Sequence, residues 1–219
     1  LDDDPEPEGI IYADQATGKK GDGEWGTNGY GRYSIPKKSG LKDYYTSQTG
    51  YKGPFGTKDV LTAANETGAD RFYVMALADI DASDHSWYSS AYGDMNDYST
   101  ATSGNFGTGK TNTTTMMEKW EGKKYGDQSV DDMWGLIKRQ VSQGWFVPSR
   151  AEWSAFAEEL GITIQNYETF GLSYCYWSSS QSYLDSAWYA YFGSDVGSGY
   201  MGDNQTVMRQ YYVRLSATF

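Results

Sequence analysis

The chain is poor in the residue types that build most metal and redox sites. Its 219 residues include one cysteine, Cys175, and one histidine, His85. A single thiol cannot form an internal disulfide or a multi-thiolate zinc site. No apolar run approaches the roughly 20 residues that span a bilayer. The sequence therefore predicts no disulfide, no metal, no cofactor and no direct membrane insertion.

Positive charge is also scarce. The chain has 18 Lys and Arg against 29 Asp and Glu, a net charge of −11. Phosphate backbones and anionic lipids repel a strongly acidic protein, which argues against nucleic-acid and membrane-surface partners. Aromatic residues, in contrast, make up 16% of the chain, too many for a disordered protein. We expect a folded domain with polar loops.

The pattern along the chain favours a single α+β domain. Residues 1–9 are acidic and contain proline, which predicts a flexible linker left after removal of a leader or anchor, and residues 10–219 form the domain. Residues 18–56 have turn signals and weak periodicity, typical of short strands or loops. Residues 71–80 are apolar almost throughout and predict a central strand, and residues 81–109 predict an irregular excursion.

Two main helices are predicted from capping-box patterns. Ser129 and Asp132 precede an apolar stripe that stops at Gly144, and Ser149 and Glu152 precede one that stops at Gly161. A shorter helix and four short strands complete the prediction: the helix over residues 113–120, and the strands over residues 144–148, 176–178, 187–192 and 211–219.

Residues 173–212 have an unusual composition. They contain 8 Tyr, 8 Ser, 4 Gly, 3 Asp and 1 Asn, but no Lys and no Glu. Antibody binding loops use the same residue types, because tyrosine offers a large contact area with few torsions to immobilise, and Ser, Gly and Asn add adaptable hydrogen bonds. Lys and Glu lose more side-chain entropy at an interface. A binding surface and an ordinary Tyr/Ser-rich β-surface both fit this composition.

Two stretches carry a family resemblance. The segment 144–153, GWFVPSRAEW, resembles a segment of bacterial C-type-lectin-like and sulfatase-modifying-factor-like domains. The segments YWSSSQ (176–181), AWYAYF (187–192) and YVRLSATF (212–219) resemble the variable protein of a diversity-generating retroelement of the gut-bacterial and phage type. The resemblance covers roughly residues 70–219. It implies a C-type-lectin-like α+β fold with small twisted antiparallel sheets, long irregular loops and neighbouring N- and C-terminal parts.

The resemblance also implies how the C-terminal segment varies. In such systems, error-prone copying at adenines converts Asn codons into codons for Tyr, Ser, Asp, Gly, Cys, Leu or Val, and Cys175 is then one random outcome. Such positions must face solvent, because substitutions in a packed core destabilise the fold. The resemblance assigns ligand binding to sixteen positions: Tyr174, Cys175, Ser182, Tyr183, Leu184, Asp185, Tyr189, Tyr191, Ser194, Asp195, Val196, Ser198, Tyr200, Asp203, Asn204 and Tyr211.

The same interpretation divides the strand over residues 187–192 into two faces. Tyr189 and Tyr191 are two residues apart and share the face that we expect to be displayed. The scaffold residues are expected to point into the core: Trp177, Trp188, Phe192, Val213 and Leu215.

Residues 104–111, GNFGTGKT, match the phosphate-binding loop pattern G-x-x-x-x-G-K-[ST]. That loop needs a buried strand before it, and the polar residues 97–103 do not predict one. We expect an ordinary glycine-rich loop leading into a helix.

Asp79, Asp81 and Asp84 form an acidic cluster, and calcium prefers several oxygen ligands. The EF-hand pattern fails, because Asp84 stands where glycine is required and Ser90 where glutamate is required. His85 has no serine in register for a catalytic triad. We expect no metal site and no catalytic residues.

The predicted function is recognition of a macromolecular ligand on another cell or on a phage host. The protein is expected outside the cell, on its surface with a possible lipid anchor, or on a phage particle, and an oligomer would add avidity. Two alternatives stay open: a non-diversified adhesin or pilus-tip domain of the same fold, and an enzyme of the formylglycine-generating superfamily. Those enzymes use paired cysteines, and this chain has one.

Overall fold

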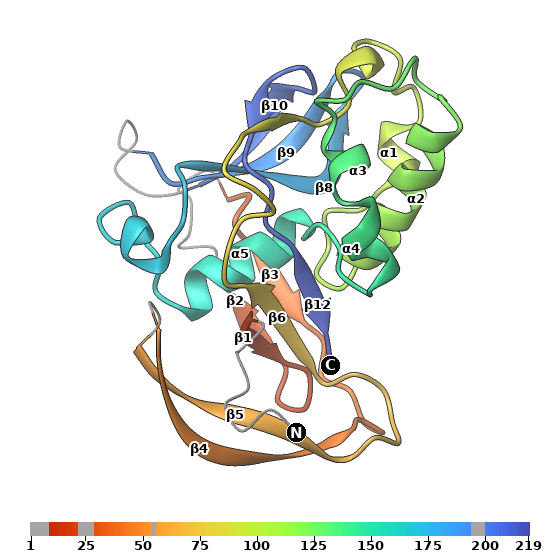
Figure 1. Ribbon diagram of the computed structural model, residues 1–219. Helices are drawn as coiled ribbons and strands as arrows, with labels where there is room; N and C mark the ends of the chain where they lie inside the picture. The colour runs from red at the N-terminus through yellow and green to blue at the C-terminus, as the bar shows by residue number, and fades with distance from the viewer. Residues whose placement is uncertain (1–8, 22–28, 54–55, 194–199) are drawn as a thin grey trace.

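The computed structural model describes residues 9–21, 29–53, 56–193 and 200–219, and its elements form the expected α+β mixture (Figure 1). The strands are β1 (Gly9–Asp14), β2 (Lys19–Gly21), β3 (Tyr33–Ile35), β4 (Asp43–Gly53), β5 (Gly56–Asn65), β6 (Phe72–Ala76), β7 (His85–Ser86), β8 (Cys175–Tyr183), β9 (Ser186–Tyr191), β10 (Tyr200–Thr206), β11 (Gln210–Tyr211) and β12 (Ser216–Thr218). The helices are η1 (Ser89–Ala91), α1 (Tyr98–Ala101), α2 (Gly109–Glu121), α3 (Met133–Leu136), α4 (Lys138–Ser142), α5 (Arg150–Glu159) and η2 (Tyr167–Phe170).

The first sheet joins the two ends of the described chain. Its strand order is β1-β6-β12, with antiparallel pairing on both sides of β6. Four of the five β6 residues are buried, as a central apolar strand requires. The prediction of a central strand within residues 71–80 is confirmed, and the N- and C-terminal strands β1 and β12 lie close together as expected, one on each side of β6.

The second sheet has the order β10-β9-β8, so β9 is its central strand. One face packs into a core cluster with Tyr176, Ala190 and Met201, and the other into a cluster with Trp177 and Ala187. Because both faces are covered, this sheet is a rigid internal layer rather than a half-exposed one.

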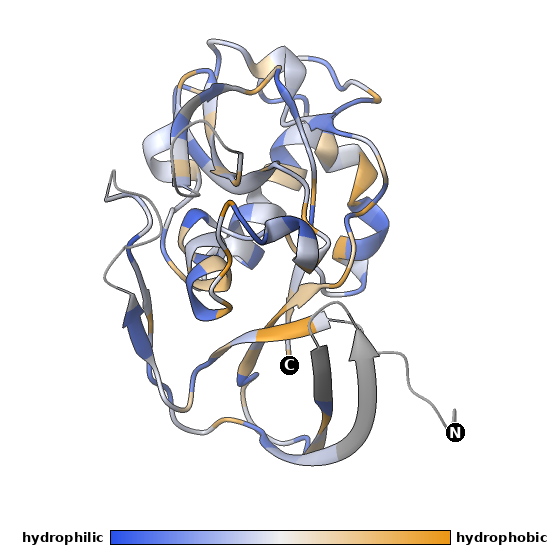
Figure 2. Ribbon diagram, turned by 90° about the vertical axis from the view of Figure 1, so that its left-hand side faces the viewer, coloured by the Kyte–Doolittle hydropathy of each residue, from blue (hydrophilic) through white to orange (hydrophobic). Residues whose placement is uncertain are grey.

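Helix α5 begins where its capping box predicts. The Ser149 hydroxyl accepts a hydrogen bond from the Glu152 amide, and the Glu152 carboxylate accepts one from the Ser149 amide at 2.7 Å. The helix predicted over residues 113–120 is also confirmed and is longer than expected, since α2 has 13 residues. Figure 2 shows hydrophobic and hydrophilic residues on the same helices, as expected for elements with one face on a core.

The other main helix is confirmed in its extent but is interrupted at Ile137, so that residues 133–142 form two short helices, α3 and α4. Asp132, and not Ser129, is the N-cap residue, and its carboxylate makes no cap bond. It accepts hydrogen bonds from the Ser89 amide, from the indole of Trp120 and from the Ser129 amide at 2.9 Å, and the last of these is one half of the predicted capping box. The Trp120 ring also lies close to Gly135, so tertiary packing overrides the local pattern.

Strands β4 and β5 pair as one long antiparallel hairpin at the lower end of the molecule in Figure 1. The sequence predicted only short strands or loops in this region. At the base of the hairpin, Tyr44 packs edge-on against Phe72 at 4.9 Å between ring centroids. Within the described ranges, no helix has the length and apolar content to cross a bilayer.

Candidate ligand-binding surface

Five of the sixteen predicted positions meet in one network, which we call the tyrosine cluster: Cys175, Tyr189, Tyr191, Tyr200 and Tyr211. Tyr191 lies opposite Cys175 on β8 and Tyr200 on β10, so the pairing register brings three strands together here. The ring centroids are 6.1 Å apart for Tyr189 and Tyr200, 5.4 Å for Tyr189 and Tyr211, and 5.3 Å for Tyr191 and Tyr200. These are favourable aromatic contact distances.

Burial favours the neutral forms of three members of the tyrosine cluster, Tyr189, Tyr211 and Cys175, because it raises the pKa of each. Burial raises the pKa of Tyr189, and the hydrogen bond with Tyr200 adds to the effect. Burial also raises the pKa of Tyr211, followed by the nearby Cys175. Burial raises the pKa of the Cys175 thiol well above its usual range. The cluster therefore offers phenol groups as hydrogen-bond donors and acceptors, and no reactive thiolate.

The expectation that every predicted position faces solvent is wrong for two of them. Cys175 is 0% exposed and Tyr189 is 5% exposed. The division of β9 into two faces is right, with Ala190 and Phe192 opposite Tyr189, but both faces are packed. The face of Tyr189 is closed by Tyr211 and Trp177, whose rings are 4.6 Å apart.

The predicted scaffold residues lie largely where expected. Trp177, Phe192, Val213 and Leu215 are buried. Trp188 is partly buried, with the Arg150 guanidinium 4.8 Å from its ring centroid. The framework beneath the tyrosine cluster is therefore aromatic and closely packed.

A second group of predicted positions lies at the other end of the sheet: Ser182, Tyr183, Leu184, Asp185 and Asp203. Residues 182–185 lie around the β8–β9 turn, so the six-residue strand β9, about 17–20 Å long, lies between them and Tyr191. Asp203 lies on β10 beside Gly202, the partner of Tyr189. Tyr183 is exposed and packs on Tyr98 of α1. The Ser182 hydroxyl donates to the Asp203 carbonyl. The structure therefore does not bring all the predicted positions into one patch.

Other predicted positions fall outside what the structure describes. These are Ser194, Asp195, Val196 and Ser198, and the side chain of Asn204. The remaining position, Tyr174, is 44% exposed and lies edge-on against Tyr212 at 6.2 Å.

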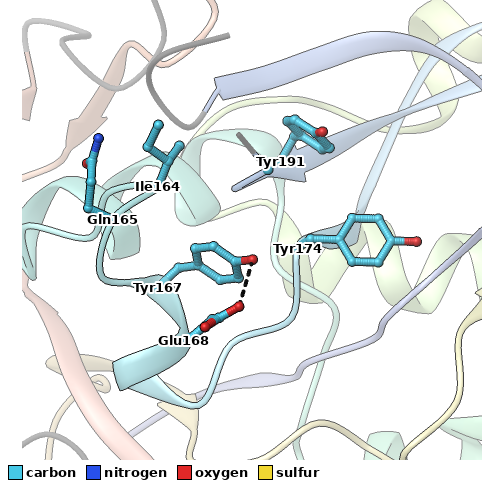
Figure 3. Close-up of a pocket in the computed structure, with 7 residues that line it drawn as sticks. Ile164, Gln165, Tyr167, Glu168, Tyr174 and Tyr191 are labelled. Carbon is cyan, nitrogen blue, oxygen red and sulfur yellow. Dashed lines mark hydrogen bonds between the residues drawn. The ribbon is translucent and has the colours of Figure 1, made fainter. Parts of the chain in front are cut away.

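Beside the tyrosine cluster lies a hollow of about 360 Å³ (Figure 3). Its walls come from η2 and the preceding loop, the residue before β8, and the end of β9: Ile164, Gln165, Tyr167, Glu168, Tyr174, Tyr191 and Gly193. Sequence reasoning missed the η2 side, because its search was confined to residues 173–212. The adjacent Tyr167 and Glu168 were the available signal, but nothing in the sequence indicates that they meet β9.

The glycine-rich segment 104–111 binds an internal anion in place of phosphate. The Glu152 carboxylate accepts hydrogen bonds from the amides of Gly107 at 3.0 Å and Gly109 at 3.2 Å. A Cβ at Gly109 would lie 2.2 Å from a Glu152 oxygen. The loop amides that would cradle a nucleotide phosphate are therefore already occupied.

The acidic residues near His85 are paired separately. Asp79 accepts from the Arg214 guanidinium at 2.7 Å and from the Tyr176 hydroxyl at 2.9 Å. Asp81 lies 3.0 Å from the His85 ring nitrogen. In the part of the chain that the structure describes, no three His, Cys, Asp or Glu side chains gather as a metal site.

Comparison with known proteins gives little further information. No protein-family model matches the chain, and no curated protein matches it. Among solved structures, a fimbrial protein from Bacteroides ovatus ATCC 8483 is similar, with a TM-score of 0.45 and 14% sequence identity. The match covers 68% of this chain and 36% of that chain, so this chain spans about a third of that protein.

Proposed function

We propose that this chain is a surface-displayed binding protein of adhesin type, which recognises a macromolecular ligand through the tyrosine cluster and Tyr174. One observation carries the proposal. Tyr191, Tyr200 and Tyr211 are only partly buried, and their rings are connected through Tyr189 to a sheet that is packed on both faces. Partly exposed rings held by a rigid layer are suited to binding, since little motion is lost when a ligand contacts them.

The proposal includes a C-type-lectin-like fold. In its favour, the first and last described strands flank β6 in one sheet, and a separate three-stranded sheet carries the tyrosine cluster. Long irregular connections separate the two sheets in sequence, as Figure 1 illustrates. A fold of this kind separates the framework that holds the domain together from the surface that contacts ligands.

We also propose that a retroelement diversifies the displayed positions. The candidates become those with exposed or half-exposed side chains, listed by their place on the sheet: Tyr174, Tyr191, Tyr200 and Tyr211 at one end, and Ser182, Tyr183, Leu184, Asp185 and Asp203 at the other. The biological role would be attachment of a cell to a neighbour or of a phage to its host. The protein would stand on a cell surface, through a lipid anchor or otherwise, or on a phage particle.

One observation favours a second candidate, an adhesin or pilus-tip domain of the same fold whose surface does not vary. Cys175 and Tyr189 are buried among aromatic rings. Free substitution at these two positions would open cavities or force overpacking, which costs about 1–5 kcal/mol. A surface that includes residues which packing prevents from varying is better suited to binding one fixed ligand.

The test of the binding function uses beads coated with the purified protein and a panel of intact bacterial strains, with capture read by flow cytometry. The triple variant Y191S/Y200S/Y211S should lose at least about tenfold in capture, because central aromatic anchors carry most binding energy. The matched control is Y45S/Y92S, which removes exposed tyrosines elsewhere (54% and 53% exposed). Equal capture by both variants would contradict the proposal.

A further inference from the structure

The hollow beside the tyrosine cluster has an unusual combination of linings. Three tyrosine rings, one carboxylate and one carboxamide line it, and none of its lining residues is a Lys or Arg. In Figure 3 Tyr167 and Glu168 lie on the η2 side, Tyr174 and Tyr191 belong to the opposite side, and the ring of Tyr174 points away from Tyr167 and Glu168. The hollow therefore has aromatic walls and one negative group.

The aromatic walls are held by their neighbours. Tyr167 stacks on Phe192 at 5.8 Å between centroids with 20° between the ring planes. The ring of Tyr191 lies over Gly193, where a Cβ would be 2.2 Å from the tyrosine oxygen. Tyr174 lies against Tyr212. The hollow is thus preformed, and a ligand does not have to order these rings.

The η2 side is anchored to the core. The backbone carbonyl of Gly171, directly after η2, accepts a hydrogen bond of 2.5 Å from Arg214. Arg214 is buried and also donates to Asp79. This anchor fixes Tyr167 and Glu168 opposite the sheet.

The electrostatic character of the hollow is negative. Glu168 makes no ion pair within the described ranges, and its carboxylate accepts a hydrogen bond of 3.3 Å from the Tyr167 hydroxyl. Burial raises the pKa of Tyr167, and Glu168 adds to the rise. Burial likewise raises the pKa of Tyr174, with a smaller contribution from the Asp84 carboxylate. A cation entering the hollow would meet the Glu168 carboxylate.

We infer that this hollow binds a positively charged side chain, the ammonium of Lys or the guanidinium of Arg, presented by a protein partner. A cation gains from aromatic ring faces and from the unpaired carboxylate together. A neutral sugar would use the rings but leave the charge of Glu168 uncompensated. This inference rests on the proposed function, because it names the chemistry of the ligand that the neighbouring tyrosine cluster contacts.

The test titrates short capped peptides into the full-length ¹⁵N-labelled protein and follows its amide signals by NMR. The probes are Ac-Gly-Lys-Gly-NH₂ and Ac-Gly-Arg-Gly-NH₂, with norleucine and glutamate peptides as neutral and acidic controls. We expect saturable, salt-sensitive shifts at residues 164–168, 174 and 191–193 with the two cationic peptides, and none with the controls.

Variants separate charge from ring contact. E168Q should weaken the binding of the cationic peptides roughly two- to fivefold, as expected for a charge pair at an exposed carboxylate. E118Q, which makes the same change at an exposed glutamate on α2, should leave their binding unchanged. Y167F should retain binding and Y167L should lose it, because phenylalanine keeps the ring face beside Glu168. Unchanged amide spectra away from the hollow would show that each variant is folded.

Equal binding of the norleucine peptide, or no effect of E168Q, would overturn the inference. Saturable binding of methyl glycosides without binding of the cationic peptides would also overturn it. None of these three results contradicts the proposed function if Y191S/Y200S/Y211S still reduces cell capture. Peptide binding with unchanged cell capture would support the hollow's chemistry and contradict the proposed function.

Discussion

Tyr189 lies over Gly202, its partner across the antiparallel pair of β9 and β10. A Cβ at Gly202 would come within 2.2 Å of two carbon atoms of the Tyr189 ring and 2.4 Å of its oxygen. Because Gly202 has no side chain, the buried Tyr189 ring can occupy this space. Cross-strand pairs of this kind fix the register of a sheet and shield the exposed glycine backbone.

The first prediction concerns this pair. G202A should destabilise the protein by about 1–3 kcal/mol, because the methyl group forces the Tyr189 ring away from its packed position. In the Y189V background, which removes the ring atoms involved, the same change should cost less than about 0.5 kcal/mol. Urea unfolding of the four proteins measures the coupling. Equal effects of G202A in both backgrounds would show that the packing of the Tyr189 ring does not require glycine at position 202.

The second prediction concerns the single thiol. Cys175 is buried and its pKa is raised by burial, so the reactive thiolate is scarce in the folded protein. Labelling with a chromogenic disulfide at pH 8 should be on the order of 100-fold slower in buffer than in denaturing urea. The absorbance time course gives both rates. Rapid stoichiometric labelling of the folded protein would place the thiol at the surface and restore it as a ligand-contacting position.

The third prediction is a pH dependence of stability. Burial raises the pKa of Glu152 to about 7, against the opposing effect of hydrogen bonds from the amides of Ser149, Gly109 and Gly107. In an unfolded chain this carboxyl titrates near 4.3, so the native state binds more protons between these two values. The stabilisation is complete below the lower pKa and is lost as pH rises through about 7, by up to about 4 kcal/mol.

Urea unfolding at several pH values between 4.5 and 8 tests this dependence. Glu152→Gln should remove the contribution and flatten the profile relative to the unmodified protein, because the amide does not titrate. The matched control is Glu118→Gln, an exposed glutamate on α2, whose profile should follow that of the unmodified protein. A profile that Glu152→Gln leaves unchanged would assign the pH dependence to other groups.

The fourth prediction concerns the buried ion pair beneath the hollow. Arg214 is 1% exposed and donates to Asp79 at 2.7 Å. Asp79→Asn should destabilise the protein by about 3–5 kcal/mol, since it leaves a buried cation without its counter-charge. Replacing both partners, D79N/R214M, should be less destabilising than D79N alone. Thermal unfolding compares the stability of the two variants. A double variant that is much less stable than D79N alone would contradict the account.

Local signals in the sequence predicted the elements that depend on few neighbours. The capping box at Ser149 and Glu152 specifies where α5 begins, because its hydrogen bonds join residues three apart. The apolar run at β6 predicted a central strand, because such a strand is covered on both faces. The closeness of the chain ends, which lie on either side of β6, followed from the family resemblance and not from any local pattern.

Features that depend on distant contacts could not be predicted. The burial of Tyr189 depends on Tyr211, which follows it by 22 positions and closes the second face of the sheet. The break between α3 and α4 depends on the Trp120 ring against Gly135. The hollow depends on η2 meeting the end of β9. In each case a residue outside the local window determines the environment, and periodicity carries no information about it.

Sequence variation among natural isolates tests the central claim most directly, because the account separates displayed positions from a rigid framework beneath them. Sequencing the part of the gene that encodes residues 1–219 across isolates should find differences concentrated at Tyr174, Tyr183, Tyr191, Tyr200 and Tyr211, with Trp177, Tyr189, Phe192 and Val213 unchanged. Differences spread evenly along the chain, or as frequent at Tyr189 as at Tyr191, would contradict the account.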